Sequence, residues 1–201
     1  MPCSSFRLRS RVVKVKRAAP PVHRLRPKVL SMLRFVPIAE IAPVLVEHLL
    51  DRAFGRDRHG RTAYAVRDGT DPVPALSFAA LDGDTLVGTI QCWPIALTHD
   101  DDGRRSPMVM VGPVAVDPPH QHHGIGHALM AHMLDAATET GADASLMLIG
   151  DPEYYGRFFG FTTERTGAWQ VPGPVLRQRL LARGPEVPAD AGMIGPRLRV
   201  S

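Results

Sequence analysis

The sequence predicts an α/β protein in which helices flank one mixed, mostly antiparallel sheet. From Met32 onwards, stretches with the period of strands alternate with stretches that have helical spacing. One strand-like stretch, 107–116, is apolar almost throughout, which is typical of a central strand buried on both faces. The chain has 201 residues, enough for one well-buried domain, and we expect that domain to span residues 32–201.

The first half of this domain divides into short apolar stretches separated by turn residues. A helical pattern ends at Gly55, and Asp82-Gly83-Asp84 joins two apolar stretches as a hairpin turn. The expected elements are a strand at 33–36, helices at 40–54 and 59–67, strands at 76–81 and 85–95, a turn at 99–105 and the central strand at 107–116.

The second half begins with the longest helical pattern, at 124–141, whose apolar residues form a broad face for burial. The pattern weakens beyond Thr162. The expected elements are this helix, a buried strand at 145–149, a short helix at 153–159, strands around 168–171 and 198–200, and loops at 172–174 and 184–195.

The basic charge of the chain lies in its first 31 residues. The formal net charge is +4, but residues 1–31 hold nine of the 24 Lys and Arg and no acidic residue, so 15 basic residues face 20 acidic ones elsewhere. This segment fits a transit peptide, a nucleic-acid-binding arm, a disordered tail or a stretch upstream of a start at Met32. We expect a disordered extension outside the domain, and no nucleic-acid partner for the mildly acidic remainder.

Cysteine content and hydropathy exclude several classes of protein. Cys3 and Cys92 are the only cysteines, which favours a reducing compartment, and we expect the cytoplasm. No apolar stretch is long enough to cross a bilayer, so we expect no membrane partner. Histidines gather between 120 and 132 without acidic or cysteine ligands at metal spacing, so we expect no metal. Cys92 is either a nucleophile or, as we favour, a small buried hydrophobe.

A Gly112-Pro113 pair interrupts the central strand. Proline cannot donate to a ladder and is tolerated inside a sheet mainly at a bulge, so we expect a bulge here. The bulge should separate neighbouring strands from each other and free backbone groups of Val114 and Val116. An extended ligand that contains amides is a suitable partner for such groups.

A glycine loop, Gln121-His122-His123-Gly124-Ile125-Gly126, stands directly before the long helix. The first turn of a helix has unpaired N–H groups and a partial positive charge, and glycines let a ligand approach the backbone closely. A strand, a glycine loop and a helix start in succession therefore predict a phosphate site. The loop lacks the Gly-Lys-Ser/Thr of a P-loop and the spacing of the dinucleotide fingerprint.

These segments resemble the GCN5-related N-acetyltransferase (GNAT) superfamily, whose signature is Gln/Arg-x-x-Gly-x-Gly/Ala after a bulged fourth strand. Gln121, Gly124 and Gly126 match it. The stretch 148–161, which contains Gly150-Asp151-Pro152-Glu153-Tyr154-Tyr155, is similar to the YhbS-type branch, although Phe158-Phe159 has one Phe more than that pattern. The likeness extends more weakly from about Leu33 to Leu181.

The resemblance implies a GNAT-like fold and acetyl transfer from acetyl-CoA to an amine of a small molecule or protein. It implies direct attack by a neutral amine, an oxyanion held by the Val114 N–H, and a tyrosine that protonates the leaving thiolate. We expect Tyr155 in that role rather than Tyr154. The implied cofactor-binding residues are Val114, Ala115 and Val116 along the strand and Gln121, His122, His123, Gly124, Ile125, Gly126 and His127 at the helix start.

Several alternatives remain open from the sequence alone. A catalytically silent acyl-CoA-binding or sensory module has the same loop, and a basic nucleic-acid-binding protein would use the N-terminal arm. Tyr154 and Tyr155 also suit simple packing of the short helix. Trp93 and Trp169 either line an acceptor pocket or pack. No residue stands out as a general base, and exposed edge strands are compatible with a homodimer.

Overall fold

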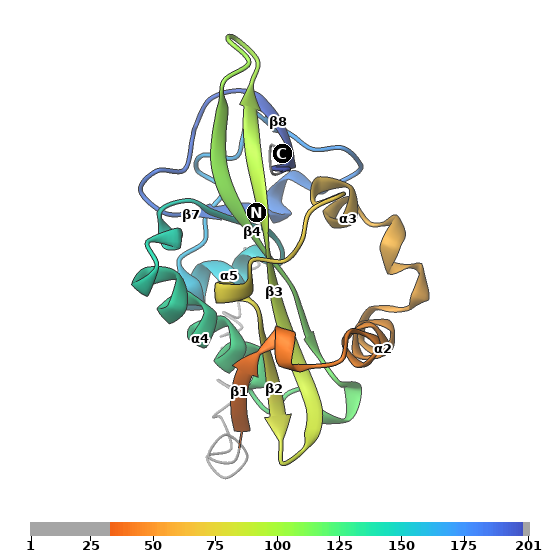
Figure 1. Ribbon diagram of the computed structural model, residues 1–201. Helices are drawn as coiled ribbons and strands as arrows, with labels where there is room; N and C mark the ends of the chain where they lie inside the picture. The colour runs from red at the N-terminus through yellow and green to blue at the C-terminus, as the bar shows by residue number, and fades with distance from the viewer. Residues whose placement is uncertain (1–32, 199–201) are drawn as a thin grey trace, which may run out of the picture.

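The computed structural model describes residues 33–198. The basic segment 1–31, which we expect to be a disordered extension, lies outside the described residues. Within them the chain folds as one α/β unit around a twisted sheet (Figure 1).

The sheet has the strand order β1-β2-β3-β4-β5-β7. Neighbours along this path are antiparallel except β4 and β5, which are parallel. Strand β8 pairs with the far half of β3 and with β6. The strands are β1 (Leu33–Pro37), β2 (Phe78–Asp82), β3 (Thr85–His99), β4 (Arg105–Val116), β5 (Leu146–Ile149), β6 (Trp169–Gln170), β7 (Leu180–Arg183) and β8 (Gly192–Pro196). The predicted mixed, mostly antiparallel sheet is confirmed.

Helices cover both faces of this sheet (Figure 1). Helices α2 (Pro43–Phe54) and α3 (Thr62–Val66) lie on one face, and α4 (Ile125–Glu139) and α5 (Pro152–Phe159) lie on the other. Alternation along β4 shows the two faces, because Val109 and Val111 pack in the cluster with α4, whereas Met108 and Met110 pack with α3.

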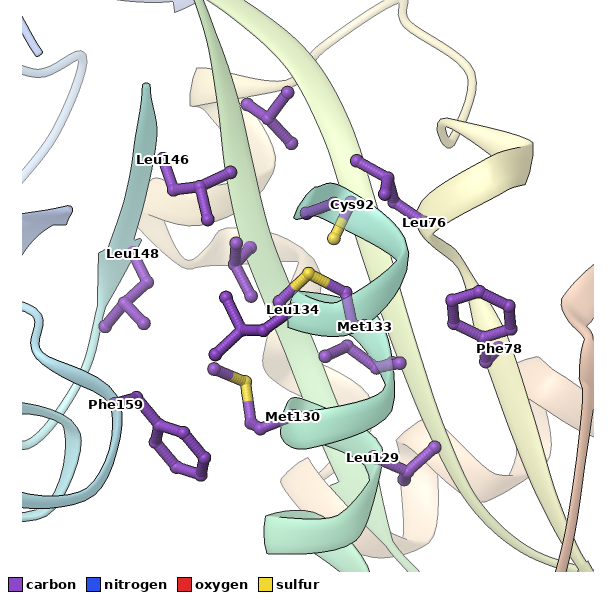
Figure 2. Packing of buried hydrophobic residues seen from close by; sticks show 14 of the residues in the cluster. Leu76, Phe78, Cys92, Leu129, Met130, Met133, Leu134, Leu146, Leu148 and Phe159 are labelled. Carbon is purple, nitrogen blue, oxygen red and sulfur yellow. The ribbon is translucent and has the colours of Figure 1, made fainter. Parts of the chain in front are cut away.

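The largest core lies between α4 and the sheet. Figure 2 shows Leu129, Met130, Met133 and Leu134 of α4 directed towards the strands. All four are buried, as is Ile125 at the helix start, whereas Asp135, Thr138 and Glu139 are exposed. Packing on this face fixes the position of the first turn of α4 against β4, where the glycine loop ends.

Several predicted element boundaries move for local steric reasons. The helix expected from residue 40 begins at Pro43, because proline suits the first helical position and keeps the preceding Ala42 extended. The helix expected at 59–67 is instead a 3-10 helix, Arg56–Gly60, followed by α3. The strand expected from residue 76 begins at Phe78, after a 3-10 turn at Pro74–Leu76.

The C-terminal predictions are partly wrong. We predicted a loop at 184–195, but β8 occupies Gly192–Pro196. Of the strand predicted at 198–200, only Leu198 lies within the described residues, and it is not part of a strand. Strand β7 was not predicted. Glycines and a proline lower the strand propensity of β8, which forms because it pairs with β3 and buries Ile194. The expected strand at 168–171 is present as the two-residue β6.

Candidate active site

The predicted bulge in β4 is present. Gln91 of β3 alone faces both Gly112 and Pro113, whereas the pairs on either side are one to one. The peptide bond between Gly112 and Pro113 is cis, and Gly112 has a φ of 122°, which favours glycine. The extra residue reverses the alternation of β4, so that Val114 and Val116 pack on the α4 face.

The same reversal turns backbone groups of β4 away from β3. The Val109 N–H donates to Ser145 O at 3.0 Å, so Val109 faces β5 and not β3. Because ladder bonds alternate and the bulge adds one residue, Val114 and Val116 also direct their N–H and C=O groups to the β5 side. Ala115, between them, faces β3.

Strand β5 does not cover this edge of β4. The β4–β5 ladder consists of Val109 opposite Leu146 and Met110 opposite Met147. Beyond the bulge the two strands diverge, as the sequence predicted. The Val116 carbonyl accepts a hydrogen bond from the Gln121 side chain at 3.2 Å, which fixes the start of the loop and leaves that oxygen one lone pair.

The glycine loop leads into α4 with two residues in left-handed conformations. His122 has φ 65° and Gly124 has φ 81°. The helix start has no side-chain cap, and its first backbone bond runs from the Ala128 N–H to Gly124 O at 3.0 Å. The amides of Ile125, Gly126 and His127 therefore precede the first helical hydrogen bond, which is the arrangement that binds anions.

The loop histidines differ in their surroundings. His122 is exposed and His123 is half-buried. The His127 ring packs on α5, with centroid distances of 5.4 Å to Phe158 and 4.8 Å to Phe159. Of these two phenylalanines, Phe159 is buried and Phe158 is 47 % exposed, so the additional Phe of this segment is accommodated at the surface. His127 thus joins the start of α4 to α5.

Helix α5 positions the two candidate tyrosines. Asp151 caps it by accepting from the Glu153 N–H at 3.0 Å, and Pro152 occupies its first turn. The Tyr155 ring lies against Gly150, where an added Cβ would come within 2.4 Å of the ring. Tyr154 packs instead on the aromatic side chains of its own helix, with centroid distances of 5.3 Å to Phe158 and 5.8 Å to Phe159.

Both tyrosine hydroxyls are protonated at neutral pH, and burial raises the pKa of each further above it. Burial raises the pKa of Tyr155 to about 12, with a smaller contribution from neighbouring Tyr154, and it also raises the pKa of Tyr154. A protonated phenol is the form that an acid catalyst requires.

A cleft of about 770 Å³ opens beside the bulge. Its walls come from β4, β5, the start of α5, the segment from α2 to α3 and the loop at 174–176. Val114 and Tyr155 line it, whereas Tyr154 does not. The structure thus brings the bulge and Tyr155 to one cavity.

Arginines that stand out in no sequence motif dominate the polar lining of this cleft. Arg58, Arg61, Arg67 and Arg179 line it, and among residues 33–198 Asp151 is the one carboxylate that does so. No histidine lines it within the described residues. Asp151 caps α5, so among the residues that line the cleft none is an evident general base. The arginines lie on segments without a motif, so only their spatial convergence identifies them.

Arg58 is part of a closed charged cluster. It pairs with Glu47 and with Asp51, the latter at 2.8 Å, and donates to the Tyr64 hydroxyl. Burial alone lowers the pKa of Arg58, but its three hydrogen bonds outweigh this and raise it. The cluster holds α2 against the segment that leads to α3.

Three other candidates from the sequence, Cys92, Trp93 and Trp169, pack against neighbouring residues. Cys92 is fully buried and burial raises its pKa well above the usual range, so it is not an activated nucleophile. Trp169 is fully buried, and Trp93 packs on Arg67.

In the described part of the chain, no group of three or more His, Cys, Asp or Glu is arranged to hold a metal ion. Between residues 33 and 198, no helix has the length and apolar character needed to span a bilayer.

Comparison with known proteins supports this fold. The sequence model of the acetyltransferase (GNAT) domain matches residues 44–163, more than half of the chain. The structure is similar to GNAT family N-acetyltransferase YhbS from Escherichia coli in complex with CoA, with a TM-score of 0.62 and 22% identity over 82% of this chain and 88% of that one. A GNAT family acetyltransferase from Brucella melitensis in complex with acetyl-CoA gives a TM-score of 0.49 and 24% identity over 75% and 94%.

A comparison with curated proteins gave no match. The likeness to the YhbS structure shows the fold, and membership of the YhbS-type branch stays a prediction. The bulged β4, the glycine loop at the start of α4 and the match over residues 44–163 agree with one another. The chain belongs to the GNAT acetyltransferase domain family.

Proposed function

We propose that this protein transfers the acetyl group of acetyl-CoA to an amine of a small molecule or protein, by direct attack. The observation that carries the proposal is the open edge of β4 at Val114 and Val116, which lies beside a cleft that Tyr155 also lines. The glycine loop and the first turn of α4 follow this edge in the chain. A long ligand with amides in its arm and phosphates at its end suits this order of groups.

The residues present fit CoA in type and order. Backbone groups of Val114 and Val116 pair with the amides of the pantetheine arm, and Ala115 between them packs the strand on α2. Amides from His122 to His127, with Gly124 and Gly126 allowing close approach, receive the pyrophosphate. An added Cβ at Gly126 would make only ordinary contacts, 3.6 Å to Val116 and 3.8 Å to Val114, in keeping with the Gly/Ala alternative of the family signature.

The transfer step needs one bond made and one broken. The amine nitrogen attacks the thioester carbonyl carbon, and the Val114 N–H stabilises the oxyanion that forms. As the C–S bond breaks, Tyr155 gives its hydroxyl proton to the thiolate. The proton lost by the amine passes to water, because the cleft holds no evident base, and Tyr155 regains a proton from solvent.

Thiol release measures this reaction directly. The full chain, acetyl-CoA and a panel of primary amines should release CoA thiol at a rate that depends on both substrates. The silent acyl-CoA-binding module would be favoured instead if no member of a broad panel of small amines and Lys-containing peptides raised the rate above that without amine. Such a module would also tolerate Tyr155→Phe without consequence.

A further inference from the structure

We propose that the amine acceptor carries a carboxylate and that Arg67 binds this group in the cleft. The inference rests on the proposed acetyl transfer and deepens it by naming the class of acceptor, a small amino acid whose amine and carboxylate lie at opposite ends. Four features of Arg67 carry the argument: its burial, its lack of an acidic partner, its rigid setting and its place along β4.

Arg67 is a buried cation without a counter-ion. Its side chain lines the cleft, yet the residue is only 6% exposed. Among the ion pairs between described residues, none includes Arg67. Glu47 acts on it through its charge, but that carboxylate is already bound to Arg58. Buried charges in proteins are normally paired, so an unpaired guanidinium in a cavity indicates a ligand of opposite charge.

The surroundings of Arg67 hold its guanidinium in place. Its central carbon lies 4.0 Å from the ring centre of Trp93 and 4.1 Å from that of Tyr64, so two aromatic rings contact it. One of its N–H groups reaches the Gly112 carbonyl at 3.4 Å. A guanidinium has five N–H donors, so this contact and the hydrogen bond to the Tyr64 hydroxyl leave others for a ligand. Two parallel donors on such an ordered group suit a bidentate carboxylate.

Burial lowers the pKa of Arg67 to about 10, although the charge and the hydroxyl of Tyr64 act in the opposite direction and raise it. The side chain is therefore still a cation at neutral pH. The single positive charge of Arg67 matches the single negative charge of a carboxylate.

The position along β4 separates Arg67 from the cofactor. Arg67 contacts Gly112, the first residue of the bulge, whereas the pantetheine groups are expected at Val114 and Val116 and the phosphates at the start of α4. Arg67 thus lies on the opposite side of Val114 from the phosphate loop. A ligand on Arg67 reaches the acyl carbon from the acceptor side.

The other charges of the cleft do not remove the need for an anion. Arg58 is satisfied by Glu47 and Asp51. Arg61 and Arg179 are exposed and their side chains donate to backbone carbonyls, Arg61 to Phe54 and Arg179 to Gly150. Water screens exposed charges, so these two contribute less to selectivity than Arg67 does.

The test compares acceptors that differ only in the carboxylate. The full chain is given acetyl-CoA with a series of ω-amino acids and, in parallel, n-alkylamines of equal length, and thiol release gives kcat and KM. Losing a charge-assisted hydrogen-bonded pair in a cleft costs roughly tenfold or more in affinity, so the best amino acid should exceed its alkylamine by at least that factor in kcat/KM. Arg67→Gln should remove the preference, and Arg67→Lys should restore some of it.

Trp93 provides a second readout that does not depend on turnover. Because its ring contacts the Arg67 guanidinium, ω-amino acids should change the tryptophan emission, alkylamines should not, and Trp93→Phe should abolish the response. Arg34→Gln removes an exposed arginine on β1 and serves as the matched charge control. Should Arg67→Gln fail to fold, the wild-type preference and the Trp93 response still decide.

Failure of the inference differs from failure of the proposed function. Two kinetic outcomes overturn the Arg67 site alone. In the first, the protein binds acetyl-CoA and acetylates amines with equal kcat/KM whether or not they carry a carboxylate. In the second, the preference for the carboxylate survives Arg67→Gln. The absence of any Trp93 response to the whole amino acid series overturns this site as well. A protein that does not bind acetyl-CoA overturns the proposed function, and the Trp93 titration still tests the carboxylate site.

Discussion

Replacing Tyr155 with Phe should lower kcat for acetyl transfer by roughly 100-fold, the usual contribution of a positioned acid catalyst. The substitution removes only the hydroxyl, and the ring that lies against Gly150 remains. Affinity for acetyl-CoA should therefore change little, so the loss should be found in kcat, as measured by thiol release at saturating cofactor. Tyr154→Phe is the matched comparison, because Tyr154 packs on Phe158 and Phe159 and does not line the cleft.

The pH profile should be consistent with this role, and the variants separate it from simple packing. Burial raises the pKa of Tyr155 to about 12, so the proton needed for catalysis is present at neutral pH and is lost only in strongly alkaline solution. Deprotonation of Tyr155 should therefore cause no fall in kcat below about pH 10, the value for an unperturbed tyrosine. Equal kcat values for wild type and Tyr155→Phe, or a larger loss in Tyr154→Phe, would contradict the assignment.

Leu129→Ala should lower the free energy of unfolding by about 3 kcal/mol, within the range for a fully buried leucine. Leu129 has no exposed surface and lies in the cluster between α4 and the sheet (Figure 2). Its side chain also lies against Gly88, where an added Cβ would approach it to 3.0 Å, so little space surrounds it. Chemical denaturation followed by circular dichroism measures the change.

The control for this variant is Val44→Ala on α2. Val44 is 56 % exposed, and an exposed substitution of this kind should alter stability by no more than about 0.5 kcal/mol. A loss below about 1 kcal/mol in Leu129→Ala would mean that α4 is not anchored as described. Weakened anchoring in a folded Leu129→Ala protein should also weaken CoA binding, because the same helix presents the amides that we propose bind the phosphates.

The sequence predicted the regions of the fold that depend on local chemistry. Gly112-Pro113 indicated the bulge, because proline has no N–H to give to a ladder, and the bulge is present. Glycines before a long apolar helix indicated the start of α4, which begins at Ile125. Strand β8 was missed because its formation depends on pairing with β3, almost a hundred residues away, and not on its own residues.

The candidate site was only half visible in the sequence. The proposed cofactor side lies in one continuous stretch with a motif, whereas the proposed acceptor side is assembled from separate segments. Arg67 follows α3, and Trp93 lies on β3, so nothing in the chain suggests that they meet. The sequence favoured Tyr155 over Tyr154 without a physical reason, and the packing of α5 supplies one, because Tyr155 lines the cleft and Tyr154 does not.

The most direct test of the account is isothermal titration of the full chain with acetyl-CoA, with Gly124→Glu as the variant. Gly124 has φ 81°, a conformation that side chains rarely adopt, and a carboxylate there would repel the pyrophosphate. The account predicts binding near micromolar affinity for the wild type and a loss of at least roughly 100-fold in the variant. No binding by folded, monodisperse wild-type protein, or equal binding by both proteins, would contradict it, and the glycine loop would then be an ordinary helix start.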